Sequence, residues 1–443
     1  MCPSPSPSPQ SLAPGGEIPA VRAPGADLAP TPDPTPDLGL DTALDLPDSP
    51  QAHVVRDDDE AVRVAEHLVP VLAAGAAQRD RERRLPVQEL ALLSASGLLG
   101  ITVPMGHGGA EVRTSTVAEV VRLLALADPN IAQIPHSHFV YVNVLRTTGG
   151  ERLRARLYAD VLAGRRLGNA QAEAGTKHAG EHRTALRRRP DGTLSLTGVK
   201  NYCTGALFAH WIPVLARDEA DRAVAAFVPR HAPGVTVVDD WDGMGQRTTA
   251  SGTVRLDDVT VEEWAVAPHH ETFTGPQLHG ARAQLLHAAI DVGLARAALL
   301  DAVDAVLTKA RPWYESTWDR AADDPLVIQQ VGELEVQVRA SEELLRAAGR
   351  AVDDAAAHLD DDSAARASIA VAVAKTHATR TCLTAGDAVL DLGGTRCASD
   401  RLNLHRHWRN ARMHTLHDPV RWKLQHIGRY AIDGTRPPRH GQI

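Results

Sequence analysis

Residues 406–419 concentrate more polar chemistry than any other part of the chain. They read RHWRNARMHTLHDP and hold three arginines and three histidines beside an asparagine and an aspartate. A surface helix seldom carries such a set together with a tryptophan, and the final Asp-Pro pair would stop a helix. Histidine exchanges protons near neutral pH, and arginine binds anions. The segment therefore predicts a site for an anionic cofactor or for proton transfer.

Four histidines in this region raise the question of a metal site: His405, His407, His414 and His417. Their spacing combines HxH with HxxH, which is not a standard zinc spacing, and no nearby glutamate completes a facial triad. No GxGxxG motif follows a strand, so the chain shows no dinucleotide site of its own. We expect no metal ion and no dinucleotide-binding domain.

The composition limits the class of protein to which these residues belong. The chain has 443 residues, of which 43% are hydrophobic and 23% charged, as in a globular protein of two or three domains. Its net charge of −8 argues against general nucleic-acid binding. We find no apolar run of the roughly 18 residues that a membrane span needs, and no secretory signal. The four cysteines are scattered, which fits a reducing cytoplasm without a disulfide framework.

The chain divides into four parts by composition and periodicity. Residues 1–50 are rich in proline, serine and aspartate, so we expect a disordered tail, inert rather than recruiting a partner. Residues 51–165 space their apolar side chains as helices do, and residues 166–275 alternate as short strands do. Residues 276–443 return to helical spacing. The expected fold class is α+β: an N-terminal helical domain, a central antiparallel β domain and a C-terminal four-helix bundle.

The same patterns predict individual elements. We expect helices over residues 58–72, 87–93, 114–127 and about 131–146, and later over 279–309, 325–358, 362–392 and about 411–430. We expect strands over residues 193–199, 211–216, 223–228, 235–238, 252–256 and 259–261.

Three motifs in this order carry a resemblance to a known family. Residues 200–206 (KNYCTGA) look like a flavin-side strand that usually reads Lys-x-aromatic-Ile-Thr-Asn. Residues 243–247 (GMGQR), followed by 256–259 (LDDV), look like Gly-x-Arg…Phe-Asp-Asp-Val. Gly393-Gly394, followed by 409–412 (RNAR), looks like Gly-Gly…Arg-Asp-Ala-Arg. Together they resemble the acyl-CoA dehydrogenase superfamily over roughly residues 55–435, and the expected order of domains agrees with its fold.

The departures from the usual family pattern point to one branch. Residues 310–314 (ARPWY) lack the Phe-Gly of the FAD-pyrophosphate motif, and no glutamine precedes Gly393. Residues 169–173 (NAQAE) replace Thr-Glu-Pro, and residues 417–419 (HDP) replace the Tyr-Glu-Gly that holds the catalytic carboxylate of many dehydrogenases. These departures resemble the FMN-dependent monooxygenases similar to dibenzothiophene monooxygenase and the sulfur-acquisition oxidoreductases.

The resemblance implies a two-component enzyme. Reduced FMN would come from a separate NAD(P)H:flavin reductase and react with O2 to a C4a-hydroperoxide that oxygenates a small, organosulfur substrate. A protein of this kind would be a cytoplasmic homotetramer, since the fold builds its cofactor site across subunits. Three alternatives remain open: an N-oxygenase or hydroxylase of a biosynthetic pathway on the same scaffold, an FAD-dependent acyl-CoA dehydrogenase with Asp418 as base, and a non-catalytic flavin-binding scaffold.

The resemblance also assigns expected roles to residues. His417 matches the catalytic histidine of the branch, although a histidine capping a helix end would look the same. His136, His138 and Tyr141 lie where the substrate wall should be, with His138 and Tyr141 also expected in catalysis; two surface histidines are the alternative. The expected flavin-ring contacts are Asn169, Ala172, Tyr202, Thr204 and His417. The expected phosphate contacts are Arg311, Thr395 and Arg396, from another subunit. We expect Arg409 and Arg412 in structural ion pairs.

Overall fold

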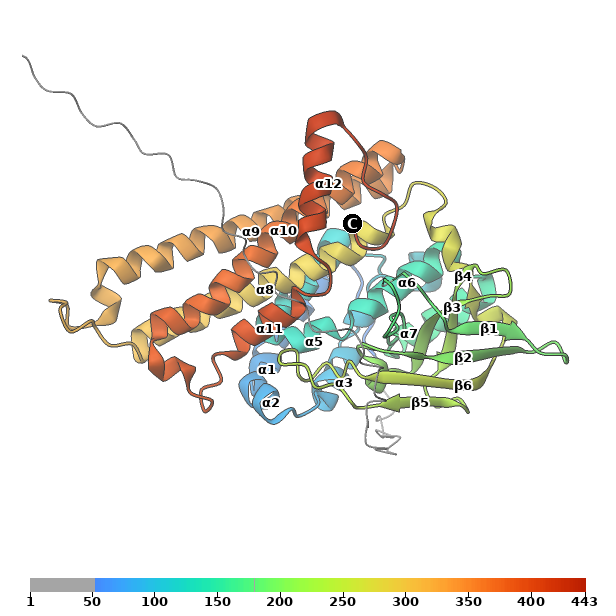
Figure 1. Cartoon of the computed structure of the whole chain (residues 1–443), viewed down its shortest axis with the longest axis horizontal. Coiled ribbons are helices and arrows are strands. Elements are labelled where there is room, and N and C mark those ends of the chain that lie inside the picture. Colours follow the sequence, from blue (N-terminus) through green and yellow to red (C-terminus); the bar gives the residue numbers. More distant parts are fainter. Residues whose placement is uncertain (1–51, 179) are drawn as a thin grey trace, which may run out of the picture. The chain divides into compact units, whose positions relative to one another are not determined.

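The computed structural model describes residues 52–178 and 180–443 (Figure 1). The expected tail over residues 1–50 lies outside this part of the chain. Within it, no helix is long and apolar enough to cross a membrane.

Helices form the N-terminal part, where several expected elements are confirmed. Asp57 caps α1 because its carboxylate accepts the N–H of Glu60, and an acidic first turn favours the same end. The expected single helix over about 131–146 is wrong, since it is two helices, α5 and α6. Pro135 has no N–H to continue the hydrogen bonds between them. The helices are α1 (Asp58–Ala73), α2 (Ala76–Glu82), α3 (Val87–Ala95), α4 (Thr114–Ala127), α5 (Pro129–Gln133), α6 (His136–Thr148) and α7 (Glu151–Leu162).

The central part is one seven-stranded sheet with the order β5-β6-β2-β1-β3-β4-β7. The expected antiparallel pairing is confirmed for the other neighbouring strands, whereas β1 pairs with β3 in parallel, through Ala185 and Arg217. Strand periodicity reports which residues alternate but not which strand lies next to which. The two short strands expected over 252–261 are one strand, β6. The strands are β1 (Ala185–Arg188), β2 (Leu194–Lys200), β3 (Trp211–Arg217), β4 (Ala223–Pro229), β5 (Val235–Val238), β6 (Thr253–Val261) and β7 (Val266–Ala267).

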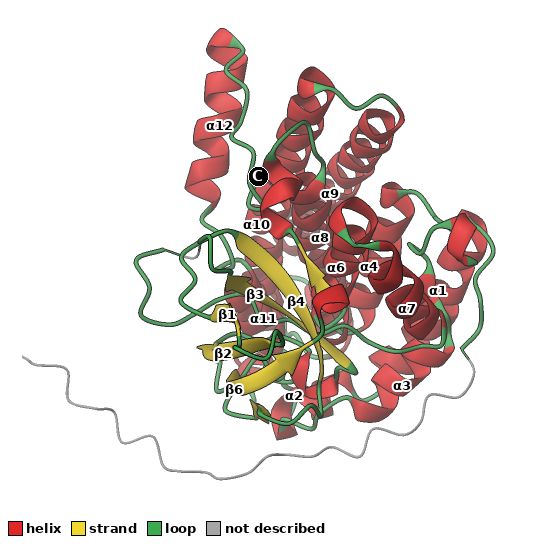
Figure 2. Ribbon diagram, turned by 90° about the vertical axis from the view of Figure 1, so that its right-hand side faces the viewer, coloured by secondary structure: helices red, strands yellow, loops and turns green. Residues whose placement is uncertain are grey.

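Three long helices dominate the C-terminal part: α8 (His279–Thr308), α9 (Pro325–Ala357) and α10 (Asp361–Gly393). Figure 2 shows them end-on behind the strands. Helix α8 packs against α4, α9 and α10, which explains why most of its side chains are buried. The fourth long helix expected at about 411–430 is wrong: the chain forms α11 (Arg406–His414) and α12 (Val420–Asp433), separated by residues 415–419. Pro419 starts α12 because its ring fits a helix N-terminus.

A contact between the sheet and α11 fixes the position of the 415–419 loop. Asn410 on α11 accepts the backbone N–H of Gln246 through Oδ1, at 2.6 Å. Gly245 approaches so closely that a Cβ there would lie 2.1 Å from the carbonyl oxygen of Arg409. This docking holds the polar segment of the C-terminal part against the loop that follows β5 (Figure 1).

Candidate active site

His417 lies in the loop between α11 and α12, with both ring nitrogens in hydrogen bonds. Its Nδ1–H donates to the carbonyl oxygen of His414 at 2.7 Å, so Nε2 is free to accept from the Gln133 side-chain amide at 3.2 Å. Part of the side chain is accessible to solvent, although dense protein surrounds the ring. Burial, and the charge that His414 would carry, lower the pKa of His417. The ring is therefore a neutral imidazole at neutral pH.

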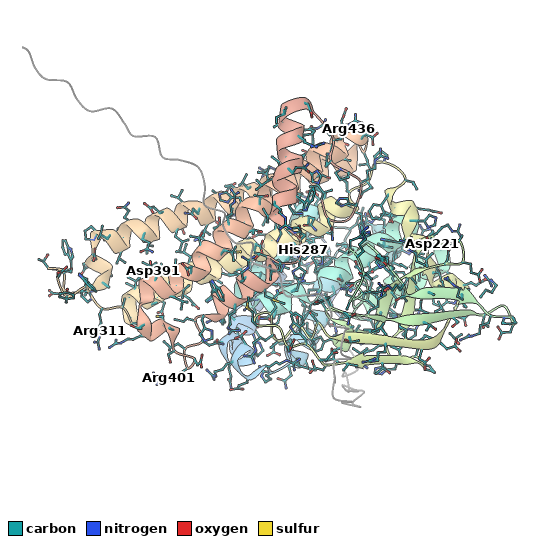
Figure 3. All side chains as sticks on the ribbon, viewed as in Figure 1. Asp221, His287, Arg311, Asp391, Arg401 and Arg436 are labelled. Carbon is teal, nitrogen blue, oxygen red and sulfur yellow. The ribbon has the colours of Figure 1, made fainter. Side chains whose placement is uncertain are left out.

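Three other histidine rings gather around His417. Its ring centroid lies 4.9 Å from that of His287 on α8 and 5.0 Å from that of His414 on α11. His136 on α6 stacks on His287 at 3.9 Å, and its Nε2 donates to the carbonyl oxygen of Ala283 at 2.9 Å. Figure 3 shows His287 in the middle of the helices. The structure thus joins two predicted site residues, His136 and His417, to a histidine that sequence reasoning missed.

A buried carboxylate orders this cluster. Asp291 accepts from His414 Nδ1–H at 2.5 Å and from Lys375 Nζ at 2.8 Å. Burial alone would raise the pKa of Asp291, but the charge of Lys375 and the hydrogen bonds from His414 and Lys375 lower it overall, so the carboxylate is ionised. Because Nδ1–H of neutral His414 donates to Asp291, the Nε2 atom of that ring accepts from His287 Nδ1–H at 3.0 Å. His287 then presents Nε2 as a proton acceptor.

The cluster also brings metal-ligating atoms together. His287, His414 and His417 each offer a nitrogen, and these atoms lie within 4.8 Å of one another. Both nitrogens of His414 are hydrogen-bonded, to Asp291 and to His287. Hydrogen bonds between side chains therefore account for the way in which these imidazole rings are arranged. The absence of a metal therefore stays a prediction, which rests on those hydrogen bonds.

The residues expected at the flavin ring lie together on the sheet side. Asn169 Nδ2 donates to the carbonyl oxygen of Tyr202 at 3.3 Å, and Ala172 accepts the N–H of Asn201 through its carbonyl at 2.9 Å. The Tyr202 side chain is 60% exposed, on a backbone with φ of 55°. Thr204 is buried and shares a hydrogen bond of 2.6 Å with the Ser251 hydroxyl. Together they form a ledge of backbone amides, one hydroxyl and one exposed aromatic ring.

Helix α5 joins this ledge to the histidine cluster. A Cβ on Gly205 would lie 3.1 Å from the carbonyl oxygen of Ile134, immediately after Gln133, which binds His417. Four buried polar atoms in this region have no hydrogen-bond partner within residues 52–178 and 180–443: Gln133 Oε1, Asn169 Oδ1, Gln246 Nε2 and Thr248 Oγ1. Buried polar atoms of native proteins are generally paired. A flat, polar-edged ring such as isoalloxazine is a ligand that fits these orphaned atoms.

His138 and Tyr141 lie on other faces of α6 and do not join the cluster. His138 Nε2 donates to the carbonyl oxygen of Leu99 at 2.9 Å, and Nδ1 accepts the N–H of Leu167 at 3.0 Å. Burial lowers the pKa of His138 to about 4 and raises that of Tyr141, whose ring packs edge-on against Phe227 at 5.9 Å. The geometry gives no support to proton transfer by His138, because neither ring nitrogen is available.

The three residues expected at a phosphate lie elsewhere in the chain. Arg311, Thr395 and Arg396 are exposed, and Arg396 Nη1 donates to the carbonyl oxygen of Lys309 at 3.3 Å. From His287 to the end of α8 is about 30 Å at the rise of an α-helix, and Figure 3 shows Arg311 at that distant end. One chain does not bring these residues to its own His417.

Three further residues of the polar segment have structural partners. Asp418 is buried and forms an ion pair of 2.6 Å with Lys423, which ties it to α12. Arg409 pairs with Asp80 at 2.5 Å, as predicted. The predicted ion pair of Arg412 is wrong, since its guanidinium donates to Thr415 Oγ1 and contacts no carboxylate among the residues described.

Comparison with known proteins identifies the family. Models of the acyl-CoA dehydrogenase N-terminal, middle and C-terminal domains match residues 59–165, 169–259 and 285–422, in that order. The chain belongs to the acyl-CoA dehydrogenase family.

Within this family, the chain is similar to a group of flavin-dependent monooxygenases. Dibenzothiophene monooxygenase of Rhodococcus qingshengii is 30% identical over 396 residues, which cover 86% of this chain and 95% of that protein. The probable FMNH2-dependent monooxygenase SfnC of Pseudomonas putida is 28% identical over 391 residues, covering 85% and 96%. The crystal structure of FMN-bound TdsC from Paenibacillus sp. A11-2 superposes with a TM-score of 0.81 at 28% identity, covering 86% of this chain and all of the other. The predicted resemblance to this branch is confirmed.

Proposed function

We propose that the protein is a two-component, FMN-dependent monooxygenase that oxygenates a small organosulfur compound with O2. A separate NAD(P)H:flavin reductase supplies the reduced FMN. The observation that carries the proposal is His417, an accessible neutral imidazole in place of the carboxylate of a dehydrogenase. The monooxygenases similar to this chain over most of its length support the same activity.

The residues present fit FMN. The ledge of Asn169, Ala172, Tyr202 and Thr204 would hold the flavin ring through its amides and the Tyr202 side chain. A single phosphate would be bound by Arg311, Thr395 and Arg396 of another subunit, because they lie too far from His417 in the same chain. Arginine suits this role because its guanidinium binds phosphate with two parallel hydrogen bonds. We infer a homotetramer on this ground, and a cytoplasmic location from the free cysteines Cys203, Cys382 and Cys397.

Bound reduced FMN supplies the electrons that activate O2. The protein itself positions a group that accepts and returns a proton, and it excludes water from the flavin. His417 Nε2 is an acceptor at neutral pH, and Gln133 holds the ring by donating to that atom. A ligand group that displaces the amide would meet a nitrogen able to take a proton and return it. The buried Asp291 and Lys375 keep the neighbouring rings in defined tautomers.

The dehydrogenase alternative has weaker support. That reaction needs a carboxylate base facing the substrate, and Asp418 is buried in an ion pair with Lys423. A carboxylate buried in this way does not face a substrate.

Reconstitution of the two-component reaction tests the proposal. The protein is supplied with reduced FMN from a flavin reductase and NADH, in air, with a panel of thioethers, sulfoxides and sulfinates. We expect an oxygenated sulfur product that depends on FMN, O2 and the protein. His417→Ala should lower the rate about 100-fold or more, because a positioned acid–base group contributes that much. Its FMN affinity should stay near that of the wild type. If the protein instead binds FAD tightly and an acyl-CoA substrate reduces that FAD, the proposal is contradicted.

A further inference from the structure

Arg282 carries a partly buried positive charge that has no carboxylate partner among the residues described. It lies on α8 near the start of the helix, and burial lowers its pKa to about 10, so it remains charged at neutral pH. Its Nη1 donates to Asn143 Oδ1 on α6 at 2.5 Å. Its four other N–H groups have no hydrogen-bond partner in the described part of the chain, and no carboxylate there lies within 4.0 Å. A guanidinium with free N–H groups at the edge of a hollow can bind an anion with two parallel hydrogen bonds.

The neighbouring charged groups are already engaged. Arg146 on α6 pairs with Glu111 at 2.9 Å and donates to the carbonyl oxygen of Thr102. Asp353 on α9 accepts the N–H of Thr114 at 2.8 Å, at the start of α4. Both carboxylates near Arg282 therefore have partners of their own. An incoming anion would meet Arg282 without displacing either one.

Arg282 stands between two adjoining hollows. Asn143, His279 and Arg282 line both of them. The inner hollow lies between α4, α6 and α8 and has apolar walls that include Val117, Phe139 and Leu286. The outer hollow has a volume of about 450 Å³ and is lined by polar backbone and side chains of residues 271–279. His279 adds a buried Nδ1 that lacks a partner in residues 52–178 and 180–443. The arrangement is a cationic, hydrogen-bonding rim beside an apolar chamber.

The inner hollow adjoins the histidine cluster. Ala283 lines it, and the carbonyl oxygen of Ala283 accepts from His136 Nε2. Arg282 and His287 are separated by about 8 Å along the axis of α8, at the rise of an α-helix. The two side chains leave the helix in different directions, so the link between the inner hollow and the histidine cluster is the Ala283–His136 contact.

We propose that Arg282 binds an oxyanion, a carboxylate, sulfinate or sulfonate, at the end of the substrate remote from the sulfur that is oxygenated. This inference rests on the proposed function and names its substrate class: an organosulfur anion with an apolar middle. The guanidinium binds the oxyanion with two parallel hydrogen bonds, and the Asn143 amide N–H and His279 complete the set of donors. The apolar walls enclose the chain between the two ends.

A matched pair of probes tests the site in the flavin-free protein. Calorimetry compares 3-(methylthio)propionate with its neutral amide, for the wild type and for Arg282→Gln, Arg282→Lys and the exposed control Arg63→Gln. We expect the wild type and Arg63→Gln to bind the acid about tenfold or more tightly than the amide. Arg282→Gln should lose this preference, and Arg282→Lys should keep only part of it, because lysine cannot bind bidentately.

Two results would overturn the inference. One is a wild type that binds the acid no better than the amide, or binds neither. The other is an Arg282→Gln variant that keeps the preference. A thermal melt and an FMN titration show whether each variant is folded. Because the measurement needs neither flavin nor turnover, a positive result alongside no oxygenation would reject the proposed function and leave the anion site standing.

Discussion

The histidines of this protein differ in what their ring nitrogens contact, and this difference separates structural from reactive rings. Both ring nitrogens of His138 form hydrogen bonds with backbone groups. In His417, Nδ1 donates to a backbone carbonyl and Nε2 accepts from a side-chain amide. His287 donates through Nδ1, and its Nε2 has no partner among the residues described. A nitrogen that only a side-chain amide contacts, or that nothing contacts, can exchange a proton, so we expect His417 and His287 to be the reactive rings.

Removing the buried carboxylate should damage the histidine cluster. Asp291→Asn leaves the Lys375 ammonium buried without a counter-ion, and we expect unfolding free energy to fall by about 3–5 kcal/mol. Urea denaturation measures the loss. Asp221→Asn, on an aspartate whose side chain is 91% exposed, is the matched control and should change stability little. A second change, Lys375→Met, should restore part of the loss, because the unpaired charge is gone. If the double variant Asp291→Asn/Lys375→Met is no more stable than Asp291→Asn alone, this role of Asp291 is contradicted.

The buried histidines predict a dependence of stability on pH. His136 and His138 are buried, and burial lowers the pKa of each to about 4. An unfolded histidine has a pKa of about 6.5, so the unfolded chain takes up protons first as the pH falls. Stability should be highest above pH 6.5 and should decline between pH 6.5 and 4, by up to about 1.4 kcal/mol per pH unit for each ring. Urea midpoints across this range measure the slope.

A non-titrating variant separates this effect from general acid denaturation. His138→Gln should be less stable at pH 7 and should show a shallower decline. His67→Gln, on the exposed surface of α1, should leave the slope unchanged. Equal slopes for the wild type and His138→Gln would show that His138 is not held neutral by burial.

At the scale of elements, the site depends on how the loop after β5 meets α11. Gly245→Ala would place a methyl group 2.1 Å from the carbonyl oxygen of Arg409, so the two segments must separate. We expect a loss of about 1–3 kcal/mol in stability. We also expect weaker FMN binding, since the neighbouring Gln246 holds one of the unpaired atoms that fit the flavin ring. Gly332→Ala is the control: a Cβ there meets nothing within 4 Å, and it should stabilise α9 by about 0.5–1 kcal/mol. Normal FMN binding by Gly245→Ala would contradict the proposed coupling.

The regular elements were predictable because their periodicity is local. The helix over residues 114–127 and the strands over 211–216 and 223–228 agree with α4, β3 and β4 within one residue at each end. The helix expected over about 411–430 ran across residues 415–419, which carry His417. The Asp-Pro pair already indicated a helix stop there, since proline disfavours helix in the residue before it.

The partners of His417 were not predictable from the C-terminal motif. His287 and Asp291 come from α8, and Lys375 comes from α10. Nothing local shows that these helices meet α11. A signal did exist, because His287 and Asp291 are four residues apart inside the otherwise apolar stretch 285–295. Lys375 and Thr379 have the same spacing. Polar pairs at that spacing share one helix face and need partners when buried.

At the scale of the whole molecule, the proposed site is shared between subunits. Arg311→Gln should weaken FMN binding about tenfold or more, through loss of a charged pair. His417→Ala should leave FMN binding intact and remove turnover. Co-expression of the two variants should restore activity to about a quarter of the wild type if subunits mix at random, because some sites then hold both native residues.

Subunit mixing and site completeness can be checked in the same preparation. Native mass spectrometry should give a tetramer for the wild type and for each variant, and tetramers of intermediate mass for the mixture. No recovery in a mixture that has formed hybrid tetramers would contradict a phosphate site contributed by a second subunit.

The central claim is that this chain inserts one oxygen atom from O2 into a sulfur compound while reduced FMN is supplied from outside. Turnover under oxygen-18 gas, with FMN and a flavin reductase, tests it most directly, by mass spectrometry of the sulfur product. We expect one oxygen-18 atom in each product molecule, and about 100-fold less of this labelled product from His417→Ala. A product that carries oxygen from water, or a substrate that is dehydrogenated without gaining oxygen, would contradict it.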